Sequence, residues 1–365
     1  MRRIVLLAVC LAALSVPARA VDAFAQEQQI LQVDSLTQGL PDEAQQAMEG
    51  LSPASRTDAG TAILRIIRWA TQLSVSALPD AVRTGAMLLA AALICSLVRP
   101  LQPGQTSLPV LTLTGAAAIC LIFTGSMRSM ASLAGQMLDE MEAYSKLLLP
   151  VMSAAATASG APAGGSVLYV GSTLFFSVLT SAIRALLLPL VYAFLALSTL
   201  ECGMDDARLG SVRQLAGWSI TAILKGIMYV FTAYLAVTGL LSGSADEAAV
   251  DAAKSTLSAA IPVVGGIVSD ASEAVLQSAR LLRATAGTFG ILAVLAMALV
   301  PFLKIAICYI TMKITAAIAG LTAGKAHAAL LTHLAAAMGY LLAMTGCTAV
   351  MMLLGTTCFL KVAAG

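Results

Sequence analysis

The sequence predicts an all-α, polytopic membrane protein: a bundle of about eight transmembrane helices, within a range of six to nine. Three stretches contain no Asp, Glu, Lys, Arg or His over a bilayer's length of helix: 108–125, 164–183 and 334–360. About 20 apolar residues in a helix cross the hydrocarbon layer of roughly 30 Å. The chain is 59% hydrophobic and 11% charged, with a mean hydropathy of +0.90. A soluble domain has no use for so many such segments.

The first element is a predicted secretory signal peptide, residues 1–20. Arg2 and Arg3 precede a short apolar core, and Ala18 and Ala20 provide the small residues before a cleavage site. Cleavage after Ala20 would place the mature N-terminus on the extracytoplasmic side. The alternative is an uncleaved first transmembrane helix, for which the apolar core is short.

Residues 21–80 form a short, polar, extracytoplasmic region that is too small to bury much of a core. Within it, apolar residues recur at helical spacing with Arg65 and Arg68 among them: Ile63, Ile66, Ile67, Ala70 and Leu73. This pattern predicts an amphipathic helix that lies on the membrane surface.

Two groups of spans follow, with helices 1–6 in 81–241 and the remaining ones in 285–365. The apolar runs place them at 82–98, 108–125, 147–160, 165–183, 185–200, 216–241, 286–311 and 328–360. With the N-terminus outside, eight crossings put these basic residues in the cytoplasm: Arg99, Arg208, Arg213, Lys313 and Lys325. Support from the positive-inside rule is modest, since the outer loops also hold basic residues.

Residues 242–284 are expected to form an extracytoplasmic, amphipathic helical hairpin. Ser244 and Glu247 have the spacing of a capping box, so a helix should begin there. Pro262, Gly265 and Gly266 would form the tip, and Asp270 would cap the second helix. The apolar tip either dips into the membrane or docks a partner; the alternative is a hairpin that rests on the bundle.

Prolines divide several of the apolar runs. The sequence Leu-Leu-Leu-Pro ends at Pro150 and again at Pro189, and Pro162 lies in a Gly/Ala/Ser-rich segment between two runs. Discontinuous helices of this kind line cavities in transporters and channels. The simpler interpretation is a Pro-kinked helix and an ordinary tight turn.

Lys225 and Lys304 are the charges expected well inside spans, with Glu201 as the nearest candidate partner. Buried ammonium groups usually face protein or water, so both lysines are candidate pathway or contact residues. The alternative is that their side chains snorkel to the cytoplasmic interface. No other carboxylate is expected at membrane depth, which argues against a proton-coupled carrier.

The motifs of common enzymes and of metal or cofactor sites are absent from the sequence. There is no phosphate-binding loop, no His-Glu-x-x-His and no Gly-x-Ser-x-Gly. The cysteines form no Cys-x-x-Cys pair, and a net charge of +2 is too small to attract nucleic acid. We therefore expect a non-enzymatic protein without metal, cofactor or nucleic-acid partner.

The order of these features resembles the stage III sporulation protein AE family of endospore-forming bacteria. The resemblance covers nearly the whole chain except the polar N-terminal region, and it rests on no single catalytic signature. Four segments carry it most clearly: 146–154, 261–273, 300–304 and 313–317.

The resemblance implies a channel-like or export-gate-like subunit of a complex in the mother-cell membrane that faces the forespore. Its implied partners are a secretion-type ATPase, ring-forming proteins and small membrane proteins, in addition to lipid and further copies of the chain. Two alternatives stay open: a stand-alone permease for a small solute, and a structural scaffold that anchors ring components. The transported molecule and the oligomeric state are left open as well.

Overall fold

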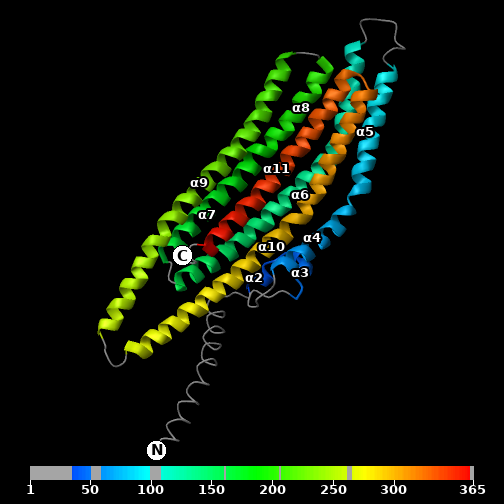
Figure 1. Cartoon of the computed structure of the whole chain (residues 1–365). Coiled ribbons are helices and arrows are strands. Elements are labelled where there is room, and N and C mark those ends of the chain that lie inside the picture. The colour runs from blue at the N-terminus through cyan, green and yellow to red at the C-terminus, as the bar shows by residue number, and fades with distance from the viewer. Residues whose placement is uncertain are drawn as a thin grey trace, which may run out of the picture.

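The computed structural model describes residues 35–50, 59–98, 108–159, 162–204, 207–260 and 265–361 (Figure 1). The predicted signal peptide lies outside these residues. Every regular element in the described part is helical, in this order: α2 (Ser35–Gln38), α3 (Asp42–Ala47), α4 (Ala59–Val75), α5 (Leu78–Val98), α6 (Leu108–Ala158), α7 (Pro162–Ala182), the π-helical turn η2 (Ile183–Leu187), α8 (Leu188–Met204), α9 (Ala207–Ala260), α10 (Gly265–Thr322) and α11 (Lys325–Lys361).

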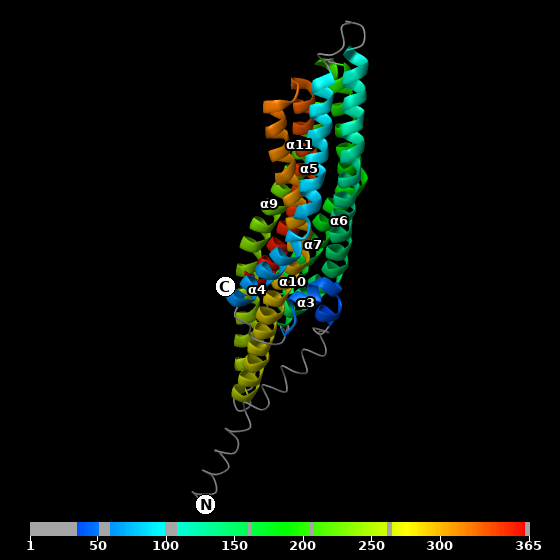
Figure 2. The same ribbon diagram turned by 90° about the vertical axis from the view of Figure 1, so that its right-hand side faces the viewer.

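The helices form an elongated slab, broad in Figure 1 and narrow in the perpendicular view of Figure 2. α10 and α11 share the most extensive contact, and both pack against α6 to make the centre. α7 and α8 connect this centre to α9 at one edge, while α4 and α5 pack against α10 at the other edge. The C-terminal ends of α5, α8 and α10 and the N-terminal ends of α6, α9 and α11 all lie at the upper end in Figure 1.

Within the described residues, six helical segments are long and apolar enough to cross a membrane, rather than the eight expected. The runs at 108–125 and 147–160 belong to one helix, α6, and the polar residues between them are not a loop. The reason is a buried stripe that continues through this polar section with helical spacing: Met127, Ala131, Ala134, Met137, Leu138, Met141 and Tyr144. Average hydropathy along the chain hides such a stripe, because charged residues occupy the opposite face.

The runs at 165–183 and 185–200 are also continuous, through α7, η2 and α8. Pro189 removes one backbone donor from this helix. The π-helical turn Ile183–Leu187 lies directly before it, and wider turns of this kind accommodate an interrupted hydrogen-bond ladder. Pro150 likewise lies inside α6 without ending it. Pro150 and Pro189 therefore lie within continuous helices, which agrees with the simpler interpretation of the sequence and not with discontinuous helices.

The expected hairpin at 242–284 is an extension of two spanning helices and not a separate unit. α9 runs on to Ala260 and α10 begins at Gly265, so the helix starts expected at Ser244 and Asp270 fall inside continuous helices. Pro262 lies outside the described residues, and only the helical backbone of Gly265, Gly266 and Asp270 is described. The capping box at Ser244 was a weak signal, because uninterrupted backbone hydrogen bonding leaves nothing to cap.

α4 is the amphipathic helix that the sequence predicts, but its apolar face meets protein. Ile66 and Ala70 are fully buried, and α4 packs along α10. Leu64 and Ile67 remain exposed on the other side, with Arg65 and Arg68 beside them. Part of the predicted apolar face thus packs against protein, and the position of α4 on the membrane surface stays a prediction.

Close packing between α7 and α9 depends on Gly171. A Cβ atom at this position would lie 2.1 Å from the ring of Tyr234, whose hydroxyl donates a hydrogen bond of 2.6 Å to the Val167 carbonyl oxygen. We predict that Gly171→Ala destabilises the protein by about 1–3 kcal/mol, because the ring must move and its hydrogen bond is strained. Thermal denaturation in detergent, followed by gel filtration of the soluble fraction, measures this change.

Gly226→Ala on α9 is the matched control, since a Cβ there meets nothing within 4 Å. It should raise stability slightly through higher helix propensity. Equal thermal midpoints for both variants would contradict the packing described for Gly171.

Candidate functional site

A cavity of about 430 Å³ lies where α3 and α4 meet α6 and α10. Five of its lining residues are charged or carry a polar amide: Asp42, Glu43, Gln136, Glu140 and Lys304. The remaining wall is mostly apolar and includes Trp69 and Pro301. α3 places Asp42 and Glu43 in its first turn, where carboxylates interact favourably with the helix dipole.

The cavity contains unpaired charge of both signs. Within the described part of the chain, neither Lys304 nor Glu140 forms an ion pair, although both are half-buried and line the same space. Their elements hold them there: Lys304 follows Pro301 on α10, and Glu140 lies in the polar section of α6. A molecule with a cationic and an anionic group fits such a cavity, as does water bridging the two charges.

Two expectations from the sequence fail at this cavity. Glu201 is not the partner of Lys304, since it binds Arg213 instead. Carboxylates also occur inside a candidate span, because Asp139 and Glu140 lie within 112–158. Asp139 forms an ion pair with Arg184 of η2.

Lys225 is not part of this site. Its side chain is exposed on α9, at the opposite edge of the slab from α3 and α4. The structure therefore does not bring the two candidate lysines together. Three of the prolines that the sequence singled out do not line the cavity either: Pro150 and Pro189 are exposed on α6 and α8, and Pro162 is the first residue of α7.

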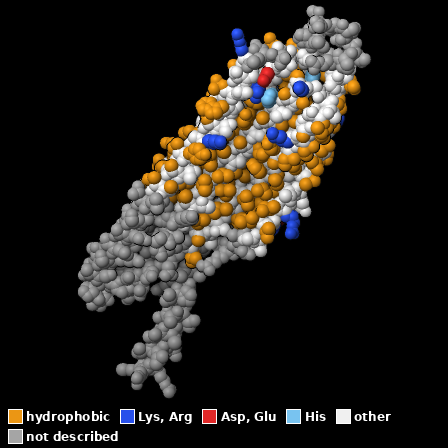
Figure 3. Space-filling model, turned by 45° about the horizontal axis from the view of Figure 1, so that its top comes forward, with side chains coloured by type: hydrophobic (Ala, Val, Ile, Leu, Met, Phe, Trp, Pro, Cys, Tyr) orange, Lys and Arg blue, Asp and Glu red, His pale blue; other side chains and the backbone are white. Residues whose placement is uncertain are grey.

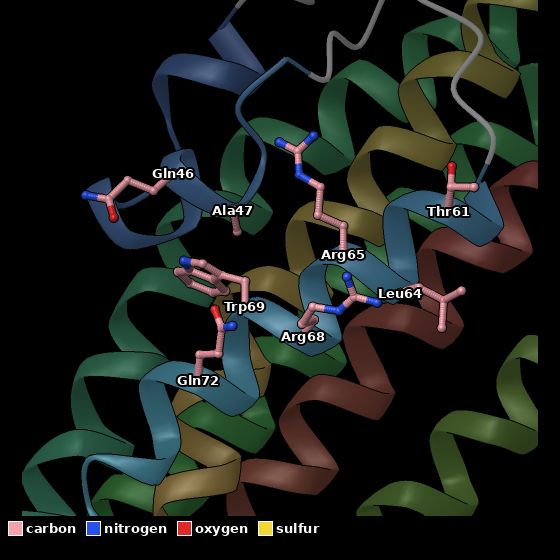
Figure 4. A pocket seen from close by; sticks show the side chains of 8 residues that line it. All are labelled: Gln46, Ala47, Thr61, Leu64, Arg65, Arg68, Trp69 and Gln72. Carbon is pink, nitrogen blue, oxygen red and sulfur yellow. The ribbon is translucent and has the colours of Figure 1, made fainter.

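A second cavity, of about 460 Å³, lies beside the first, between α3 and α4 (Figure 4). Trp69 borders both cavities, and Arg65 and Arg68 project from successive turns of α4. Arg65 donates a hydrogen bond to the Glu49 carbonyl oxygen, which fastens the end of the α3 segment to α4. The sequence pointed to these arginines only as part of an amphipathic helix.

An ionic and aromatic cluster joins α8, α9 and α11 near their upper ends. Arg213 Nε donates to Glu201 Oε2 at 2.5 Å, and the Arg213 guanidinium lies 5.7 Å from the centroid of the Phe194 ring. Phe194 in turn makes edge-on contacts with Tyr340 and His333, at centroid distances of 5.3 and 6.3 Å. Sequence reasoning missed this cluster, although Glu201 and Arg213 flank one short connection between helices.

Within the described residues, no group of three or more His, Cys, Asp or Glu side chains is arranged to hold a metal ion. None of the six cysteines from Cys95 onward forms a disulfide in the described part of the chain.

Comparison with protein families matches residues 51–363 to stage III sporulation protein AE. The chain belongs to the stage III sporulation protein AE family. The matched range includes all six candidate spanning helices and both arginines of α4. The protein is thus a sporulation-related membrane protein. No curated protein and no solved structure gives a significant match.

The Arg213–Glu201 pair is largely enclosed, with side-chain exposures of 12% and 28%. We predict that Arg213→Gln destabilises the protein by about 3 kcal/mol, because it leaves the Glu201 charge without its partner. The double variant Arg213→Gln with Glu201→Gln should recover much of that loss. The wild type, Arg213→Gln, Glu201→Gln and the double variant form a double-mutant cycle, read from their thermal midpoints. Strictly additive effects would show that the two side chains do not interact.

Proposed function

We propose that this protein is a non-enzymatic, channel-like or export-gate-like subunit of a transport complex between mother cell and forespore. Membership in the stage III sporulation protein AE family supports a role in sporulation and in the membrane. The observation that favours transport over pure anchoring is the cavity with Lys304 and Glu140, where unpaired charges line an open space within a bundle of apolar helices. Intramembrane or membrane-adjacent charges of this kind commonly mark solute or ion pathways.

Two other functions remain as alternatives. A stand-alone permease would use the same cavity without companions. A scaffold would use the surface of the bundle and have no need of the cavity charges. Recovery of partner proteins distinguishes the proposal from a stand-alone permease. The effect of neutralising Lys304 on sporulation distinguishes the proposal from a scaffold.

The partner prediction concerns the full-length, tagged protein in an endospore-forming bacterium whose own family member is deleted. Affinity purification from gently solubilised membranes of sporulating cells should recover a secretion-type ATPase, ring-forming proteins and small membrane proteins. Mass spectrometry identifies them. A homo-oligomer in good yield without these companions would favour the permease.

The charge prediction uses Lys304→Gln in the same cells. Loss of a charge that contacts a passing molecule costs about 1.5–3 kcal/mol, so we expect heat-resistant spores to fall by about tenfold or more while companion recovery stays unchanged. Lys225→Gln, on the exposed face of α9, is the matched control and should sporulate normally. Normal sporulation of both variants would favour the scaffold.

A further inference from the structure

The helices are too long for a single bilayer to cover them. α6 has 51 residues and α10 has 58, which correspond to about 76 and 87 Å of helix. The hydrocarbon layer is about 30 Å thick. Figure 3 shows apolar side chains over most of one face, so hydrophobicity alone does not locate the lipid.

Charged residues recur at one distance from the upper ends of their own helices. Five of the six spanning segments carry such a residue 18 to 20 positions from their upper terminus: Asp80 from Val98 in α5, Arg128 from Leu108 in α6, Arg184 from Met204 in α7–α8, Lys225 from Ala207 in α9 and Lys304 from Thr322 in α10. At 1.5 Å per residue, this spacing is about 27–30 Å. It equals the thickness of the hydrocarbon layer.

We infer that lipid surrounds only the upper part of the bundle, between the helix ends and this belt of charges. Asp80, Arg128, Arg184, Lys225 and Lys304 then lie at the lower membrane interface, where long charged side chains reach water and headgroups. The rest of the bundle stands outside the bilayer, on the side that holds α2, α3 and α4. This inference does not depend on the proposed transport function.

The competing placement puts the bilayer around the lower part, where the uncharged run 164–183 lies. There α7 exposes Val167, Val170, Leu174 and Val178, and α9 exposes Val230 and Val237. Two observations weigh against it. α5 is a complete candidate span and lies wholly in the upper part, where it needs lipid. In the lower part, α6 carries Glu142 and Lys146 within its length, α2 packs against it, and α3 and α4 pack against the neighbouring α10.

The upper band contains one charge far from both of its borders. Lys313 is nine residues from the end of α10, about 14 Å deep, with Nζ 5.8 Å from the centroid of the Tyr309 ring. Arg213, nearer the border, is paired with Glu201. In this placement Lys313 lies near the middle of the membrane. The sequence alone predicts Lys225 and Lys304 at that depth.

The two tryptophans of the chain allow a direct test. Trp218 on α9 is 67% exposed and lies about 16 Å below the upper end, near the middle of the band. The protein is reconstituted in phosphatidylcholine–phosphatidylglycerol vesicles whose acyl chains are brominated near their midpoints, and tryptophan emission is compared with unbrominated vesicles. Trp69→Phe isolates Trp218. Leu174→Trp or Val237→Trp, with both native tryptophans changed to Phe, reports on the lower part.

The inference predicts that Trp218 loses about half or more of its emission, while tryptophan at position 174 or 237 loses little. Strong quenching at 174 or 237 would overturn it, whether or not Trp218 is quenched. Absence of quenching at Trp218 would overturn it as well. Val237→Trp lies on a different helix, so agreement between the two positions shows that the result at Leu174 is not caused by its local surroundings. Gel filtration confirms that each variant is folded.

Discussion

The fold depends on one continuous apolar stripe along each central helix, which holds α6, α10 and α11 together over far more than the depth of a bilayer. Through the polar section of α6, every third or fourth residue remains buried, from Met127 to Tyr144. This stripe lets charged residues occupy the outer face without breaking the helix. The central helices are too long for one short helix to cover. Along the same edge of the slab, α5 therefore packs against the upper part of α10 and α4 against the lower part.

The same constraint explains which parts of the fold the sequence predicts. Membrane class, helical content and the amphipathic character of α4 follow from composition and spacing. The number of spans does not, because hydropathy counts residues along the chain and ignores faces. Pro150 and Pro189 also looked like breaks, yet exposed prolines in long packed helices need only a kink or a π-helical turn. The family resemblance, in contrast, came from the order of segments, and the match over 51–363 confirms it.

In the candidate site, too, the sequence predicts one part and the tertiary structure determines the rest. Lys304 was identified from the sequence as an unusual charge, and it does line a cavity. Its surroundings come from the tertiary structure, since α3 and the polar section of α6 supply the carboxylates from more than 150 residues away. Glu201 was paired with the wrong cation, because its true partner Arg213 lies on the next helix rather than at similar predicted depth. Separation along a helix says little about which neighbour a side chain meets.

The number of crossings is tested most directly by the side of the membrane on which the α6–α7 connection lies. A reporter inserted between Ala158 and Pro162, paired with reporters in the α5–α6 and α9–α10 connections, gives that side by alkaline phosphatase activity or green fluorescence. Six continuous helices put the α6–α7 connection on the same side as the α9–α10 connection. A signal on the side of the α5–α6 connection would contradict the account, since it requires the additional crossing that the long, unbroken α6 excludes.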